Sequence, residues 1–135
     1  MEYVGKLVKN IKDLNEQTFR GKSLLMVATK KEYIETVKLL LKNNSCIDIL
    51  DKEGEAPLHY AVMQGNTELI NLLISEGADI NIQNRNGITP LMKITSFFPL
   101  LMSNATRVTV AKLLMEKGAN IHLKDSFGRN LFLIS

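Results

Sequence analysis

Residues 51–83 read DKEGEAPLHYAVMQGNTELINLLISEGADINIQ, and the next segment, NRNGITPLMKI (84–94), begins again in the same frame. Gly54 and Gly87 take the same place in the two segments, which sets the repeat period (87 − 54 = 33). A third glycine, Gly21, lies one period before Gly54 (54 − 21 = 33) and again leads into an apolar segment. Repetition at such a period predicts a solenoid of stacked units, because one short unit cannot bury its apolar face alone.

Each unit carries the signals of two short helices. Pro57 suits the first turn of a helix, where its missing N–H would have no partner in any case. Gly65 interrupts that helix, and Asn66 or Thr67 can cap a second helix with a broad apolar face. Gly77 ends the second helix, and the turn residues after it predict a finger-like hairpin that projects from the stack.

The unit 51–83 resembles the ankyrin repeat, whose pattern is close to DxxGxTPLHxAAxxGxxExVxLLLxxGADxNx. The matching positions are Asp51, Gly54, Pro57, Leu58, His59, Ala61, Gly65, Glu68, Leu72, Leu73, Gly77, Ala78, Asp79 and Asn81. The resemblance implies an all-α ankyrin-repeat solenoid of helix-turn-helix units with β-hairpin-like finger loops. It divides the single domain, 1–135, into full units at 18–50, 51–83 and 84–124, with partial units at 1–17 and 125–135.

The neighbouring units depart from the family pattern at a few positions. Met26 and Met92 stand where the pattern has histidine, and Asn44 stands where it has the helix-terminating glycine. Asn is the tolerable substitute there, because it adopts the left-handed conformation more readily than other non-glycine residues. We therefore expect the helices of the degenerate first unit to form.

The third full unit carries an insertion. The glycine equivalent to Gly87 in the next finger is Gly128, and the distance between them exceeds the repeat period (128 − 87 = 41; 41 − 33 = 8). The surplus falls within about Thr95 to Arg107, in the segment SFFPLLMSNAT (96–106). Pro99 opposes one straight helix through this segment. Its apolar side chains either pack as additional core or form an exposed docking patch, and the sequence leaves both interpretations open.

Composition bounds the class of protein. The chain has 135 residues, 17 basic and 14 acidic side chains and a net charge of +3, which is below the concentrated basic footprint of a nucleic-acid binder. Its single cysteine, Cys46, permits no internal disulfide and favours a reducing compartment. No apolar stretch approaches a membrane span. We expect a cytoplasmic protein, or one acting in a host cytosol if it is a secreted effector, with neither nucleic acid nor membrane as partner.

The titratable residues form no catalytic or metal-binding pattern. His59 and His122 stand apart from other ligand residues at metal-binding spacing. The resemblance implies that His59 hydrogen-bonds the backbone of a neighbouring finger, and His122 falls at a turn. Cys46 has no partner base nearby in sequence. We expect no enzyme activity, no metal and no cofactor.

The expected fold exposes a surface that could bind another protein. Ankyrin-like domains engage proteins through finger tips and the exposed face of the inner helices, and this resemblance is transferred residue by residue. The partner-binding candidates are Phe19, Arg20, Lys22, Lys30, Lys31, Lys52, Glu53, Glu55, Met63, Gln64, Arg85, Asn86, Ile88, Phe97, Phe127 and Arg129. They mix Arg, Met, Ile and Phe, which supply affinity in many interfaces. The basic first finger favours a partner with an acidic patch.

Three roles are compatible with this sequence. The first is a noncatalytic protein-protein interaction module. The second is a dedicated inhibitor or immunity-type protein, and the third is a bacterial or viral ankyrin factor directed at a host protein. The apolar segment Leu131 to Ile134 also predicts an unprotected edge, which either a self-association contact covers or the rest of a longer protein continues.

Overall fold

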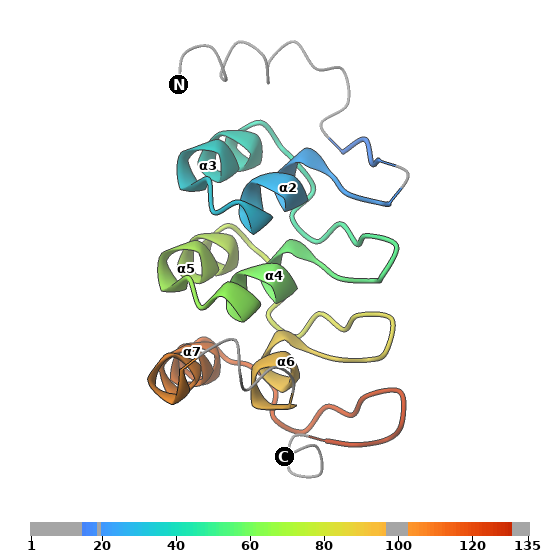
Figure 1. Cartoon of the computed structure of the whole chain (residues 1–135), viewed down its shortest axis with the longest axis vertical. Helices are drawn as coiled ribbons and strands as arrows, with labels where there is room; N and C mark the ends of the chain where they lie inside the picture. The colour runs from blue at the N-terminus through green and yellow to red at the C-terminus, as the bar shows by residue number, and fades with distance from the viewer. Residues whose placement is uncertain (1–14, 19, 97–102, 131–135) are drawn as a thin grey trace.

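The computed structural model describes residues 15–18, 20–96 and 103–130, and in these residues six helices and no strands are present. The helices are α2 (Leu24–Lys30), α3 (Ile34–Lys42), α4 (Pro57–Gln64), α5 (Thr67–Ser75), α6 (Pro90–Ser96) and α7 (Asn104–Glu116). They stack as antiparallel pairs, with finger loops projecting to one side (Figure 1). The all-helical ankyrin-type solenoid expected from the sequence is confirmed.

The repeat period is visible in where the inner helices begin. Helices α2, α4 and α6 begin at Leu24, Pro57 and Pro90, and successive starts differ by one period (57 − 24 = 33; 90 − 57 = 33). Each inner helix packs against its own outer helix, and α4 also packs against both α2 and α6. The inner helices therefore form a continuous row beside the fingers, with α3, α5 and α7 on the far side (Figure 1).

The helix boundaries follow the sequence signals. Pro57 occupies the first turn of α4, and the side chain of Asn66 caps α5 by accepting a hydrogen bond from the N–H of Leu69 (3.0 Å). Asn44 has a φ of 66°, which is the left-handed conformation expected after α3, and Gly77 has a φ of 102° after α5. Both positions thus end an outer helix as predicted.

The core lies between the two rows of helices. Its fully buried aliphatic side chains come from every helix pair, because the apolar residues of each helix face the other row and the adjacent units. They include Leu25, Val37, Leu40, Leu58, Val62, Leu69, Ile70, Leu73, Leu91, Val110 and Leu114. Truncating one such side chain to alanine typically costs about 2 to 5 kcal/mol.

The finger loops stack directly on one another. Gly54 has a φ of 77°, and a Cβ added there would lie 2.5 Å from the backbone nitrogen of Arg85 in the next finger. Gly21 and Gly87 approach the next finger in the same way, with 2.6 Å to the nearest backbone nitrogen in each case. Only glycine provides both the backbone conformation and the space at this position.

The insertion separates α6 from α7. Helix α6 ends at Ser96, and the side chain of Ser103 caps α7, which begins at Asn104. Arg107 reaches back from α7, where its Nε donates to the carbonyl of Ile94 (2.9 Å) and its Nη2 to that of Thr95 (3.2 Å). The arginine therefore satisfies carbonyls at the end of α6, where the second unit uses the left-handed Gly65.

Several expectations lie outside the described residues. These are the first fourteen residues of the partial unit at 1–17, the apolar part of the insertion at 97–102 and the C-terminal segment 131–135. The two interpretations of the insertion, and the proposed self-association edge, stay predictions.

A glutamine at the base of a finger bridges adjacent units. The Nε2 of Gln17 donates to the carbonyls of Gly21 and Leu50, both at 2.7 Å. Gln83, two periods later, repeats the arrangement by donating to Gly87 (3.0 Å) and Lys124 (2.9 Å). The equivalent position between them holds Leu50, whose side chain is 42% exposed.

We expect Leu50→Gln to stabilise the chain. The introduced amide would bridge the carbonyls of Gly54 and Gln83 as its two counterparts bridge theirs, and it would remove exposed apolar surface. A net gain of about 0.5 to 1.5 kcal/mol should raise the melting temperature by about 2 to 6 °C. Thermal unfolding followed by circular dichroism measures this, with Leu50→Ala as the control that lacks the amide. Equal melting temperatures for the two variants would contradict the bridge.

Candidate functional site

The residue after the finger glycine is turned away from solvent in the first three fingers. Lys22, Glu55 and Ile88 occupy this position, one repeat period apart in each case (55 − 22 = 33; 88 − 55 = 33). Glu55 and Ile88 are 6% and 4% exposed, and the side chain of Lys22 is 19% exposed. The sequence-based assignment of Glu55 and Ile88 to the exposed partner-binding surface is therefore wrong, and Lys22 is largely occupied within the protein. The chain runs back into the stack here, and the side chains of Lys22 and Glu55 bond to residues of the following unit.

Lys22 joins a polar network between the first two units. Its Nζ donates to Asp51 Oδ2 and to Tyr60 Oη, at 2.6 Å each, and Tyr60 Oη donates to the same carboxylate oxygen. Burial opposes the charge of Asp51, but the hydrogen bonds from Lys22 and Tyr60 outweigh it and lower the pKa of Asp51. Burial, together with the hydrogen bond to Asp51, raises the pKa of Tyr60 to about 12.

Two ammonium groups lie over the ring of Tyr60. The Nζ of Lys22 is 4.7 Å from the ring centroid, and the Nζ of Lys30 is 5.0 Å from it. Asp51 compensates the charge of Lys22, whereas Lys30 is exposed and its ring contact is cation–π in character. The network thus holds a cation at the surface of the inner helices.

Glu55 forms the corresponding network one unit later. Its Oε1 accepts from Asn84 Nδ2 (2.7 Å) and from Lys93 Nζ (2.5 Å). Its Oε2 lies 3.8 Å from His59 Nδ1 and has no hydrogen-bond partner among the described residues. The residue types differ from those of the first network, but the three positions are equivalent, since Asn84 lies one period after Asp51 and Lys93 one period after Tyr60.

His59 is a structural residue that links two units. Its Nδ1 accepts from the N–H of Ala56 (3.0 Å), so the proton is on Nε2, which donates to the carbonyl of Ile88 (2.9 Å). The side chain is fully buried, and this burial lowers the pKa of His59. The hydrogen bond to the neighbouring finger that the family resemblance implied is present.

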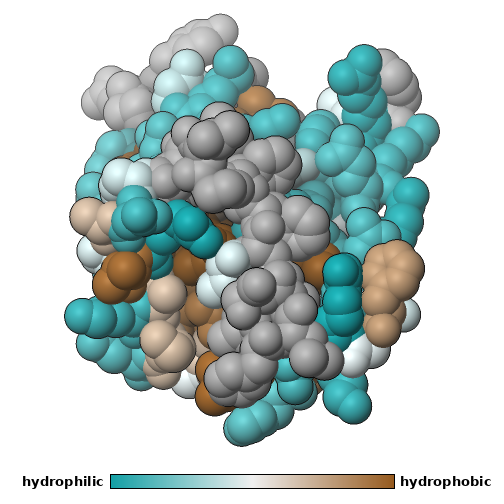
Figure 2. All heavy atoms as spheres, turned by 60° about the horizontal axis from the view of Figure 1, so that its bottom comes forward, coloured by the Kyte–Doolittle hydropathy of each residue, from teal (hydrophilic) through white to brown (hydrophobic). Residues whose placement is uncertain are grey.

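The remaining candidates divide by exposure. The exposed ones come from the finger tips and the end of α2: Arg20, Lys30, Lys31, Lys52, Glu53, Arg85, Asn86, Phe127 and Arg129. Met63 and Gln64 are half-buried at the end of α4, where Gln64 Nε2 donates to the carbonyl of Lys30 (2.6 Å). Phe19 and Phe97 lie outside the described residues. The finger side of the stack is covered mainly by hydrophilic side chains at its C-terminal end (Figure 2).

Sequence reasoning missed three positions that shape this surface. Tyr60 and Lys93 hold the two networks, and Val27 is their counterpart in the first unit (27 + 33 = 60; 60 + 33 = 93). Their positions could have been recognised from the repeat. Each residue lies at the same place in its unit, one helical turn after the start of its inner helix, so the three side chains share one face of the stack.

His, Cys, Asp and Glu side chains of residues 15–18, 20–96 and 103–130 form no group of three that could hold a metal ion. Within the same ranges, no helix has the length and apolar character needed to cross a membrane.

Comparison with known families agrees with this geometry. The family model of ankyrin repeats in three copies matches residues 2–84, which is more than half of the chain. The chain belongs to the ankyrin-repeat family. Domains of this family generally mediate protein–protein interaction and are typically noncatalytic. No curated protein matches the chain. Helices α6 and α7 continue the stack beyond the matched range.

We expect His59→Met to destabilise the chain by about 1 to 3 kcal/mol, because it leaves the Ala56 N–H and the Ile88 carbonyl without their partner. Methionine fits the volume, since Met26 and Met92 are buried at the equivalent positions. Denaturant unfolding at neutral pH measures the loss. Adding Ala56→Ser should recover part of it, because Ser23 and Thr89 cap the equivalent helices through their hydroxyl groups.

The same variant should unfold with a weaker pH dependence. The pKa of folded His59 is below the unfolded value of 6.5, so just below pH 6.5 the unfolded chain binds a proton that the folded chain does not. The stabilisation by neutral His59 is complete above pH 6.5 and declines as pH falls below it. The gap between wild type and His59→Met should therefore narrow from pH 7.5 to pH 5.5. A constant gap would contradict the buried neutral histidine.

Proposed function

We propose that this chain is a noncatalytic protein-interaction module that binds an acidic segment of a partner protein across its finger tips and inner-helix face. The proposal rests on how the charges of this surface are distributed. Three carboxylates near it are neutralised by ion pairs within the chain, whereas several of its cations face solvent with no carboxylate partner among the described residues. The surface extends over the proposed units 18–50, 51–83 and 84–124.

The carboxylates that form ion pairs within the chain belong to the two networks and to the last finger. Asp51 pairs with Lys22 (2.6 Å) and Glu55 with Lys93 (2.5 Å). Asp125 binds Arg129 (2.9 Å) and accepts from the backbone of its own finger. The pKa of Asp125 is lowered because these hydrogen bonds outweigh its desolvation. These acids neutralise neighbours and offer little charge to a ligand.

The uncompensated cations occupy the same face. Lys30 and Lys31 end the first inner helix, and Lys52 and Arg85 lie on the second and third fingers, all exposed. None of the four has an ion pair with a carboxylate among the described residues. Glu53 is the exposed acid among the partner-binding candidates. A surface of this kind attracts an acidic partner and disfavours a basic one.

Because these cations have no carboxylate partner among the described residues, binding an acidic segment would not first require an ion pair to be broken. An exposed lysine already paired with a carboxylate would have to exchange one partner for another, with little net gain. Lys30 and Lys31 would instead gain a counter-ion on binding, and Lys30 is already positioned by the ring of Tyr60 (5.0 Å). Pre-positioning reduces the side-chain entropy that association would otherwise cost.

We expect Lys30→Glu/Lys31→Glu to weaken partner binding by about tenfold or more, because two attractive charges become repulsive. The matched control is Lys38→Glu/Lys42→Glu, which makes the same charge change at exposed positions of the outer helix α3. Affinity capture with the full chain from its native host, quantified by mass spectrometry, compares both variants with wild type.

The control variant is expected to retain the captured partner, and both variants are expected to keep the wild-type circular dichroism spectrum. Equal losses in the two variants would show that net charge alone acts. Retention by Lys30→Glu/Lys31→Glu would exclude the inner-helix face as the binding surface.

A further inference from the structure

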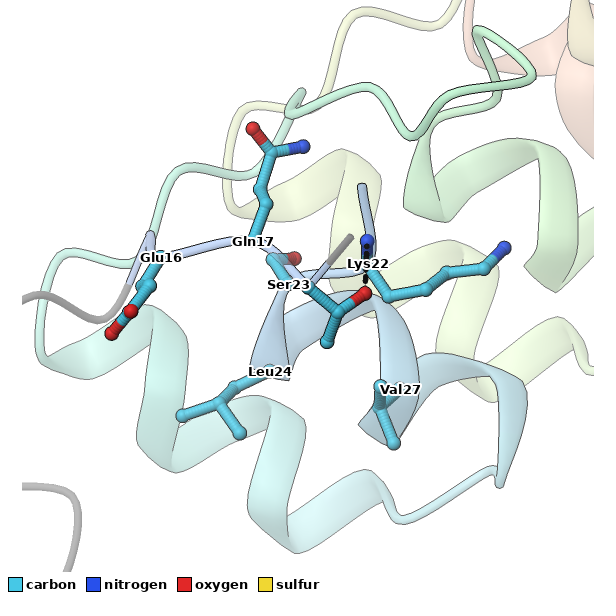
Figure 3. Close-up of a pocket in the computed structure, with 7 residues that line it drawn as sticks. Glu16, Gln17, Lys22, Ser23, Leu24 and Val27 are labelled. Atoms are coloured by element: carbon cyan, nitrogen blue, oxygen red, sulfur yellow. Dashed lines mark hydrogen bonds between the residues drawn. The ribbon is translucent and has the colours of Figure 1, made fainter. Parts of the chain in front are cut away.

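The first inner helix has an apolar cleft beside it. Leu24 and Val27 project from α2 and are 41% and 37% exposed. They form the apolar part of a cleft of about 370 Å³, whose polar lining includes Gln17, Thr18 and Lys22. In Figure 3 both aliphatic side chains extend from α2, and the segment that holds Gln17 borders them.

In the second unit, the residues equivalent to Leu24 and Val27 are covered by a neighbouring unit. One period later, Leu24 corresponds to Pro57, which is buried, and Val27 corresponds to Tyr60, which is half-buried. The preceding unit covers that face of α4, because α2 packs against α4 and Lys22 binds the Tyr60 hydroxyl (2.6 Å). Leu24 and Val27 thus occupy positions that the preceding unit covers on α4. Among the described residues, no side chain covers them in the same way.

The charges around the cleft indicate the occupant. Lys22 lines one margin, and Lys30 follows Val27 by nearly one turn along the same helix. Burial disfavours the charge of Lys22, but its hydrogen bonds to Asp51 and Tyr60 outweigh this and raise the pKa of Lys22, so it stays protonated. Asp51 already compensates the charge of Lys22, so Lys30 is the cation beside the cleft that attracts a carboxylate.

The opposite margin carries the other sign of charge. Glu16 lines the cleft there and is exposed, and Figure 3 shows it and Lys22 on opposite sides of Leu24. A carboxylate of the occupant would be repelled on this side and attracted on the other. The charge pattern gives the bound segment an orientation, with its acidic residues toward Lys30 and away from Glu16.

We propose that this cleft is the anchor site for a large aliphatic side chain of the acidic partner segment, whose neighbouring carboxylates face Lys30. The inference rests on the proposed function and adds the apolar anchor to it. Apolar anchors in a pocket supply most of the affinity in many interfaces, whereas exposed ion pairs contribute mainly orientation and association rate. An acidic segment without an aliphatic side chain would bind weakly.

The test uses three acetylated and amidated peptides, EELLEE, EEAAEE and KKLLKK, with the full chain labelled at its Leu and Val methyl groups. EELLEE should shift the NMR signals of the Leu24 and Val27 methyl groups in a saturable way. EEAAEE and KKLLKK should each bind at least about fivefold more weakly, because one lacks the anchor and the other lacks the charge. In the variant Val27→Asp, which has no methyl group at position 27, the shift of the Leu24 methyl groups should be lost.

The matched control is Val108→Asp on α7, where an exposed valine (52%) lies far from the cleft in the sequence and on an outer helix. It should bind EELLEE as wild type does. If EELLEE perturbs the amides of Lys30 and Lys31 but no methyl group of the cleft, the anchor is overturned while the proposed function stands. If it perturbs neither region, both are contradicted. Equal binding of KKLLKK would overturn the charge requirement.

Discussion

The close approach of each finger to the next one is the constraint from which the surface of this protein follows. A glycine in each of the first three fingers lies against the backbone of the following finger, where a Cβ would sit within 2.6 Å of a backbone nitrogen. This contact fixes adjacent units in register. The next side chain, at position 22, 55 or 88, is turned away from solvent, and Lys22 and Glu55 bond to residues of the following unit.

That direction explains why one position carries three unlike residues without disturbing the fold. Lys22 meets Asp51 and Tyr60, Glu55 meets Asn84 and Lys93, and Ile88 is buried as an apolar residue. At each unit boundary the same position is turned away from solvent, but the residues that surround it differ. Buried polar groups that are matched across units stabilise the register, because an unmatched one would remain desolvated without a hydrogen bond.

The same matching separates structural charge from charge that a partner can use. Carboxylates near the inner-helix face are held by the repeat stack, and lysines at the end of α2 and on the fingers are left to solvent. The apolar cleft of α2 lies beside these lysines, because no described side chain covers Leu24 and Val27 as α2 and its finger cover Pro57 and Tyr60. Charge and apolar surface therefore meet at one end of the stack.

The sequence by itself determined the period, the helix boundaries and the family, since Pro57, Asn44 and Gly77 act through local backbone conformation and their spacing repeats. It did not reveal that Glu55 and Ile88 are buried or that Tyr60 holds Lys22. Those outcomes depend on which side chain faces which across a unit boundary. Only the tertiary structure decided them, because side chains about one period apart in sequence, such as Lys22 with Asp51 and with Tyr60, meet only when the units stack.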